Sequence, residues 1–179
     1  MRIIGKKDNL NFVLYKSFES RLFSPIGKYV SWKLENKWDD YNELHHAVSY
    51  LEDLKSRDGI WYEIHTLESN KEIKGVLTIV GGDISTIESE KHLDLEKTLV
   101  LKYFHILEKG KGHGSYWLNS VILPHYREKG FSNIHVSSSH PKSFDFYKKI
   151  GSELNSYTKM SDNGLFKREC KSFLIKIDG

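Results

Sequence analysis

The stretch Thr98–Gly114, TLVLKYFHILEKGKGHG, says more about the fold than any other part of the chain. Its first part, Thr98–Leu107, is almost continuously apolar, which is typical of a central strand buried on both faces of a sheet. A glycine-rich turn, Lys109–Gly114, follows, and Ser115–Lys129 is predicted to be a helix. The stretch therefore predicts a central strand that leads through a glycine loop into a helix.

This order of elements predicts an anion site. The first N–H groups of a helix have no partner within it and lie at the positive end of the helix dipole. The glycines Gly110, Gly112 and Gly114 let the backbone approach a phosphate closely, and Lys109 and Lys111 add positive charge. A pyrophosphate is thus the predicted ligand of this loop. A tight turn with solvated lysines is the alternative, and the glycines alone give both interpretations equal weight.

The loop does not match two common nucleotide-binding patterns. A dinucleotide-binding loop needs the spacing G-x-G-x-x-G, whereas Gly110, Gly112 and Gly114 alternate. A Walker loop ends in Gly-Lys-Ser/Thr, and no such sequence ends this loop.

The flanking segments predict a mixed sheet. Apolar spacing predicts a helix over Asp39–Lys55, capped by Asp39 or Asp40, and a second over Pro141–Ile150 that ends at Gly151. Pro25 predicts a break near Ser24, and Pro124 predicts a kink or an early end of the helix after the loop. The other predicted strands are Asn11–Tyr15, Ile60–Leu67, Ile73–Val80, Asn133–Ser137, Leu154–Met160 and Ser172–Ile177. Because helices and strands alternate in the second half, the predicted class is α/β or α+β with a mixed sheet.

Composition and charge limit the function classes. The chain has 179 residues, of which 39% are hydrophobic and 28% charged, so we expect a single domain over residues 1–179. The basic residues are dispersed and the net charge is +3, which argues against nucleic-acid binding as a main role. Cys170 is the only cysteine, so no intrachain disulfide can form, and no stretch is apolar enough to span a membrane. These features, with no signal peptide recognised, predict a cytoplasmic protein, and the nine histidines show no zinc-site spacing.

Two motifs resemble those of the GNAT (GCN5-related N-acetyltransferase) superfamily. Its phosphate loop reads Arg/Gln-x-x-Gly-x-Gly/Ala, and Lys109, Gly112 and Gly114 stand at these three places. A second family pattern, Asn-x-x-Ala-x-x-x-Tyr, corresponds to His140, Ser143 and Tyr147. The chain departs from both patterns, with Lys for Arg/Gln, His for Asn and Ser for Ala. The resemblance is specific over residues 98–151.

The resemblance implies a sheet of about seven strands, with the fourth and fifth splayed apart to admit acetyl-CoA (coenzyme A) as co-substrate. It implies direct acetyl transfer to an amine of a small molecule or peptide, without a metal, and it allows a homodimer. The residues that it places at the cofactor are Phe104, Ile106, Lys109, Gly110, Lys111, Gly112, His113, Gly114, Ser115, His140 and Ser143.

The reaction needs a base for the amine and an acid for the departing thiolate. By resemblance, Tyr147 is the acid, and packing of its ring on the sheet is the alternative. His135 stands where some relatives carry a carboxylate, and histidine as a residue type ordinarily titrates near neutrality, so this position is the candidate base or else a core histidine. Lys102 and Ser137 are the candidate substrate-binding residues.

Strand alternation extends this assignment. Counting by twos from Thr98 places Lys102 and Phe104 on the cleft face and His105 on the opposite face. Glu63 and His65 share one face of an earlier strand and are predicted either to line the acceptor site or to be half-exposed surface residues.

Three functions are compatible with the sequence. The first is an N-acetyltransferase. The second is a non-catalytic acyl-CoA-binding or sensing module, to which the departures at His140, Ser143 and Ser152 give weight. The third is a nucleic-acid-associated module, including toxin-like relatives that acetylate charged tRNA, and the dispersed charge argues against it.

Overall fold

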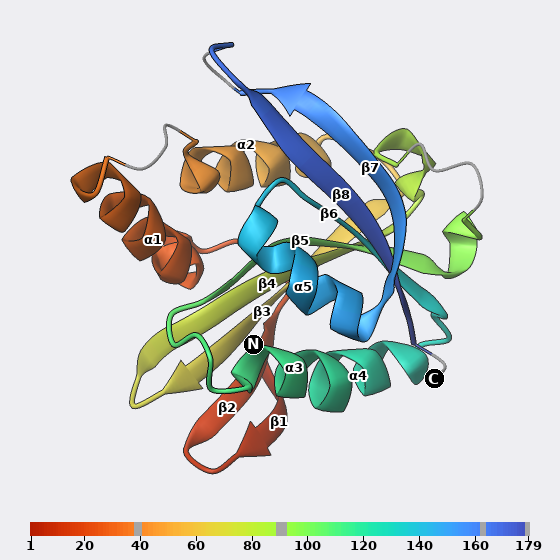
Figure 1. The fold of residues 1–179 in the computed structure, drawn as a ribbon. Helices are drawn as coiled ribbons and strands as arrows, with labels where there is room; N and C mark the ends of the chain where they lie inside the picture. The colour runs from red at the N-terminus through yellow and green to blue at the C-terminus, as the bar shows by residue number, and fades with distance from the viewer. Residues whose placement is uncertain (38–40, 89–92, 162–163, 178–179) are drawn as a thin grey trace.

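The computed structural model describes residues 1–37, 41–88, 93–161 and 164–177. Eight strands form one sheet in the order β1-β2-β3-β4-β5-β6-β8-β7 (Figure 1). Neighbouring strands are antiparallel except β5 and β6, which are parallel, so the predicted mixed sheet is confirmed. The strands are β1 (Arg2–Lys7), β2 (Leu10–Tyr15), β3 (Ile60–Ser69), β4 (Glu72–Gly82), β5 (Thr98–Ile106), β6 (Asn133–Ser138), β7 (Ser152–Met160) and β8 (Lys167–Lys176).

The strand that the sequence did not predict is β1. It lies at the edge of the sheet, is mostly exposed and carries Arg2, Lys6 and Lys7, with Ile4 packed against the core. An edge strand of this kind has little hydrophobic alternation to reveal it, and charges on it discourage pairing with other chains. It accounts for the eighth strand. Because it comes first in the chain, the strands expected as the splayed fourth and fifth are numbered β5 and β6.

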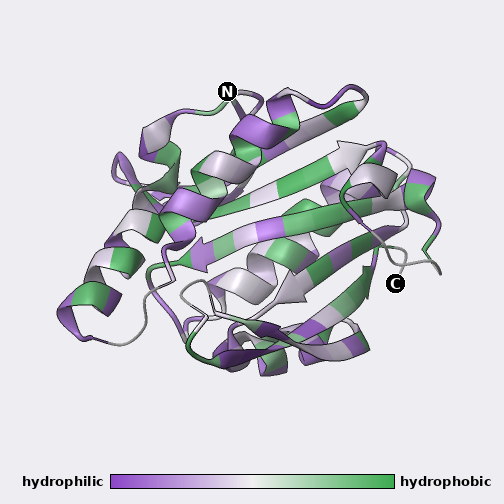
Figure 2. Ribbon diagram, turned by 90° about the horizontal axis from the view of Figure 1, so that it is seen from above, coloured by the Kyte–Doolittle hydropathy of each residue, from purple (hydrophilic) through white to green (hydrophobic). Residues whose placement is uncertain are grey.

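Helices cover both faces of the sheet. On the α1–α2 face, α1 (Ser24–Glu35) and α2 (Glu43–Lys55) pack on one core that includes Ile64, Val80 and Val100. On the α3–α5 face lie α3 (His113–Trp117), α4 (Leu123–Arg127) and α5 (Pro141–Ile150), over a second core. Figure 2 shows hydrophobic residues recurring along the central strands between these layers. Within the described ranges, no helix is both long and apolar enough to cross a membrane.

The first two helices differ in part from the prediction. The break predicted near Ser24 is the boundary between a short 3-10 helix, Ser20–Phe23, and α1, and Pro25 lies in the first turn of α1, where proline is tolerated because that N–H has no helical partner. The helix predicted over Asp39–Lys55 begins at Glu43, and its cap is the side chain of Asn42, which accepts from His45 N at 3.0 Å. Asp39 and Asp40, the expected caps, lie outside the described residues.

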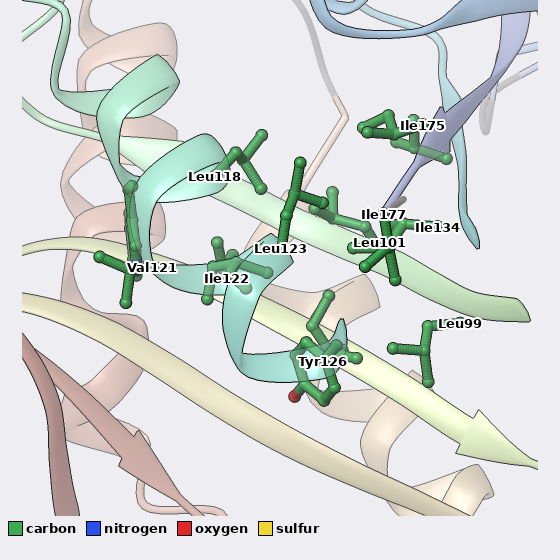
Figure 3. Packing of buried hydrophobic residues seen from close by; sticks show 14 of the residues in the cluster. Leu99, Leu101, Leu118, Val121, Ile122, Leu123, Tyr126, Ile134, Ile175 and Ile177 are labelled. Atoms are coloured by element: carbon green, nitrogen blue, oxygen red, sulfur yellow. The ribbon is translucent and has the colours of Figure 1, made fainter. Parts of the chain in front are cut away.

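A continuous helix follows the glycine loop and passes through Pro124. A π-helical turn, Leu118–Ile122, joins α3 to α4, and Pro124 then falls in the first turn of α4. The wider turn accommodates the missing proline N–H without ending the helix. Figure 3 shows Leu118, Ile122 and Tyr126 directed at the sheet, so the π-helical turn keeps one apolar face on the core.

The parallel strands β5 and β6 pair over only part of their length. Thr98–Leu101 of β5 pairs with Asn133–Val136 of β6, and no pairing continues beyond. Lys102–Ile106 therefore has β4 on one side and no β6 partner on the other. The expected splaying is observed at the end of β5 that leads into the glycine loop.

A β-bulge at Tyr103 changes which face the end of β5 presents. Tyr103 has φ of 54°. Lys102 pairs with Thr78 of β4 and His105 pairs with Val76, so the two residues between them on β5 lie opposite one residue of β4. The bulge adds one residue on β5 and inverts the alternation after it.

Candidate functional site

The glycine loop lies between the end of β5 and the start of α3. Gly110 and Gly112 have φ of 79° and 74°, and a Cβ at either would have no atom within 4 Å. Gly112 caps α3, and its carbonyl accepts from Tyr116 N at 3.0 Å. Glycine is favoured at both positions because the backbone there is left-handed, and not because a larger side chain would clash. The space beside the helix N-terminus is open, which suits an anion.

Two lysines supply the charge of the loop unequally. Lys111 Nζ lies 2.5 Å from Glu108 Oε2, so much of its charge is neutralised. Lys109 Nζ lies 5.1 Å from the ring centroid of Tyr29 in α1. A cavity of about 320 Å³ opens beside the loop, and its lining residues are Asp8, Asn9, Leu10, Leu67, Ser69, Lys74, Ile106, Glu108, Lys111 and His113.

Gly114 brings the first turn of α3 close to β5. A Cβ at Gly114 would lie 3.3 Å from Ile106, 3.5 Å from Phe104 and 3.4 Å from Phe146. The Phe104 ring lies 5.7 Å from Trp117 and 5.8 Å from Phe146, within the α3–α5 core. Phe104 and Ile106 thus form the apolar side of the gap, next to the loop. Ser115 is exposed on the same first turn as the partly buried His113.

The start of α5 forms the opposite side of the gap. The Ser143 hydroxyl donates to His140 O at 2.8 Å and lies 2.8 Å from Ser138 Oγ, which accepts from His140 N at 3.1 Å. His140 Nε2 is 2.8 Å from the hydroxyl of Tyr29. Ser143 therefore fixes the start of α5, and His140 links it to α1. The sequence did not predict a role for Tyr29, because the segment around it shows no clear hydrophobic period.

Tyr147 is buried on the α3–α5 face. Its ring lies 5.5 Å from Phe173 and 5.3 Å from Phe146, and the residue is 6% exposed. Its hydroxyl has no hydrogen-bond partner among the described residues. Burial raises the pKa of this phenol, so it stays protonated near neutral pH.

His135 projects from β6 to the α1–α2 face, since Ile134 and Val136 belong to the opposite core. It is 1% exposed, and its Nδ1 lies 2.5 Å from Glu88 Oε2. The carboxylate of Glu88 is therefore in direct contact with the imidazole. Glu88 falls within the polar segment Gly81–Glu96, and only the folded chain brings it to β6.

Lys102 and Ser137 lie on the same face as His135. Lys102 Nζ is 5.7 Å from the ring centroid of Tyr50 in α2. Ser137 stands two residues after His135 on β6 and is half-buried. The structure thus brings the predicted base and both predicted substrate-binding residues to one face of the sheet.

The expected positions of Phe104 and His105 are wrong. Because the Tyr103 bulge inverts the alternation, Phe104 faces away from Lys102, and His105 shares the α1–α2 face with it. The His105 ring lies 5.2 Å from Tyr29. Burial, with Lys109 nearby, lowers the pKa of His105 to about 3.

The interpretation of Glu63 and His65 as acceptor-site or half-exposed residues is also wrong. Both are buried on the α3–α5 face, where the Tyr126 hydroxyl donates to Glu63 Oε2 at 2.7 Å and lies 2.7 Å from His65 Nε2. Lys129 Nζ lies 2.8 Å from Glu63 Oε2. The network joins α4 to β3 and has no part in the gap.

No protein-family model and no curated protein matches the chain, but solved structures share its fold. A Desulfovibrio desulfuricans protein assigned to the GNAT family has 10% identity and a TM-score of 0.61, over 94% of this chain and 99% of its own. A Staphylococcus aureus N-acetyltransferase has 12% identity and a TM-score of 0.58, over 94% and 99%.

A third structure bears on the ligand. A Salmonella typhimurium protein classed as an acetyltransferase, solved with its cofactor acetyl-CoA, has 11% identity and a TM-score of 0.57, over 93% of this chain and 94% of its own. At these identities the likeness is one of fold. The chain therefore has the fold of the GNAT acetyltransferases, as its two motifs suggested.

Proposed function

We propose that the chain transfers an acetyl group from acetyl-CoA to a primary amine of a small molecule or peptide. One observation carries the proposal: the open glycine loop and the gap between β5 and β6 lie at the same end of β5. Acetyl-CoA supplies the acetyl group as an activated thioester and carries the pyrophosphate that the loop suits. The Salmonella neighbour with bound acetyl-CoA supports this choice of co-substrate.

The loop and the two sides of the gap are the proposed cofactor-binding residues. N–H groups at the start of α3, with Lys109, attract the pyrophosphate. Phe104 and Ile106 offer apolar contact on one side, and the start of α5 lies on the other. The full proposed set is Phe104, Ile106, Lys109, Gly110, Lys111, Gly112, His113, Gly114, Ser115, His140 and Ser143.

His135 is the proposed base. At neutral pH a primary amine is largely protonated, and it must lose that proton before its nitrogen can attack the thioester. His135 accepts that proton directly or through a water, and Glu88 stabilises the imidazolium that results. Lys102 and Ser137 flank this position and are the proposed contacts to the rest of the acceptor.

Tyr147 is the proposed donor to the departing thiolate sulfur. Its hydroxyl has no acceptor within the described part of the chain, so it is available for a ligand. A phenol whose pKa is raised by burial is a weak acid. It therefore stabilises the thiolate by hydrogen bonding more readily than by full proton transfer.

A non-catalytic acyl-CoA-binding module is the second candidate. The observation that favours it is the 2.8 Å contact of Tyr29 with His140, which ties α1 to the α5 side of the gap. Such a link could hold the gap closed on the side where an acceptor would enter, while acetyl-CoA binds from the opposite side of the gap.

Release of free thiol from acetyl-CoA, with a panel of amines, tests the proposal. His135→Gln should slow turnover about 100-fold, the lower range for a lost general base, with acetyl-CoA affinity unchanged. His45→Gln, at an exposed position on α2, is the matched control and should behave as wild type. Binding without turnover on any amine would favour the module, and loss of both would reject both candidates.

A further inference from the structure

Basic side chains gather around one tyrosine on the α1–α2 face. Three of them lie near the ring centroid of Tyr41: Lys33 Nζ at 5.7 Å, Lys159 Nζ at 5.9 Å and Arg168 Cζ at 5.1 Å. Lys159 and Arg168 are register partners on β7 and β8, so they project from the same face of the sheet. We call Lys33, Lys102, Lys159 and Arg168 the cationic cluster.

Lys102 belongs to this cluster although it lies on β5. Its Nζ lies 5.7 Å from the ring centroid of Tyr50, on the same α1–α2 face as Lys159 and Arg168. Burial lowers the pKa of Lys102 and Lys159 adds to the effect, while Glu88 opposes both. The strands β5, β7 and β8 thus contribute positive charge to one region, next to the His135 and Glu88 pair.

Two carboxylates near the cluster, within the described part of the chain, are already in contact with other groups. Lys33 pairs with Glu43, its Nζ lying 2.7 Å from that carboxylate, and Glu88 lies against His135. The ammonium groups of Lys102 and Lys159 make no hydrogen bond or ion pair with any described residue. Lys102 is half-buried and Lys159 is exposed, so an anionic ligand bound between them would chiefly pair the partly buried charge of Lys102.

The spacing from the proposed base limits the size of this ligand. His135 is the register partner of Val100, and Lys102 follows Val100 by two residues on the same face. Strand geometry separates the Cα atoms of Lys102 and His135 by roughly 8 Å. One small molecule can therefore reach both residues.

We infer that the acceptor is an anionic amine, whose carboxylate or phosphate binds Lys102 and Lys159 while its amine lies at His135 and Glu88. This rests on the proposed function and adds the substrate class. It argues against polyamines and lysine-rich peptides, because the cationic cluster repels them.

Kinetics on paired amines test the inference. The probes are amino acids, their uncharged amides, aminoalkylphosphonates and spermidine, with kcat/KM as the readout. Wild type should prefer the anionic amines over the amides by about tenfold or more, as expected for a charge-assisted hydrogen bond. Lys102→Met should abolish that preference, because it should lower kcat/KM for the anionic amines much more than for the amides. Lys149→Met, which removes an exposed lysine on α5, should change nothing. The ratio of carboxylate to phosphonate turnover identifies which anion is bound.

Phosphate binding provides a readout that does not need turnover. Gly112→Glu blocks the anion site of the loop, so inorganic phosphate should still raise the melting temperature of this variant through the cationic cluster. The double variant Gly112→Glu/Lys102→Met should lose that shift. An equal shift in both, or equal turnover of amides and anionic amines, would overturn the inference and leave the acetyltransferase proposal intact. Failure of wild type to bind acetyl-CoA would instead reject that proposal, and the phosphate result would still decide whether this is an anion site.

Discussion

Replacing Tyr147 by phenylalanine should separate activity from stability. The hydroxyl makes no hydrogen bond with the described residues, and the ring alone makes the contacts with Phe173 and Phe146. Its removal should therefore change the free energy of unfolding by less than about 0.5 kcal/mol, as for a substitution that breaks no named interaction. Acetyl transfer should slow by a factor of about 10 to 100, because a donor to the leaving thiolate is lost.

Tyr126→Phe is the matched control with the opposite expectation. Its hydroxyl donates to the carboxylate of Glu63 and contacts His65, both buried. A hydrogen bond to a charged group contributes about 1.5–3 kcal/mol, which corresponds to a loss of roughly 3–12 °C in melting temperature for a chain of this size. Turnover at a permissive temperature should hardly change, since the network lies outside the gap.

Thermal unfolding and thiol release, measured on both variants, give the comparison. The reasoning would be refuted by a Tyr147→Phe protein that is destabilised by more than about 1 kcal/mol, because its hydroxyl would then have a structural partner. Undiminished turnover in that variant would remove Tyr147 from the chemistry.

Three further predictions concern pH, the base and a helix cap. The folded-state pKa of His105 is about 3, so below about pH 6.5 the unfolded chain takes up a proton that the folded chain cannot. Urea unfolding should thus show stability falling as pH decreases from 6.5, with His105 contributing up to about 1.4 kcal/mol per pH unit, and His105→Gln should reduce that slope. Glu88→Gln removes the anion beside His135 and should slow amine acetylation roughly tenfold, with acetyl-CoA affinity in a titration unchanged. Asn42→Ala removes the cap of α2 and should cost about 1 kcal/mol in the same unfolding assay.

Local patterns predicted the elements that depend on few residues. The glycine loop lies between a central strand and a helix because Gly110 and Gly112 supply the left-handed conformations that the turn requires. The helix over Pro141–Ile150 has its predicted bounds, since proline begins it and Gly151 follows it. These features are encoded within a few residues of where they occur.

Features that depend on tertiary structure could not be predicted in this way. The bulge at Tyr103 has no glycine to mark it, yet it inverts the faces of Phe104 and His105. Glu88 comes from a polar segment, and its contact with His135 exists only after β5 and β6 pair. Simple alternation along β5 was insufficient, because one extra residue reverses every position after it.

The most direct test of the central claim is a thermal-shift titration with acetyl-CoA on wild type, Gly112→Glu and Gly130→Glu. Gly130 also has positive φ and open space around it, but it follows the C-terminal end of α4, away from the glycine loop. It therefore controls for the strain of the substitution. At a ligand concentration of 100 Kd, binding should stabilise wild type by about 2.7 kcal/mol, and Gly130→Glu should retain this gain. Gly112→Glu, which places bulk and negative charge at the proposed phosphate position, should lose it. No stabilisation of wild type, or equal stabilisation of all three proteins, would contradict the role assigned to the loop.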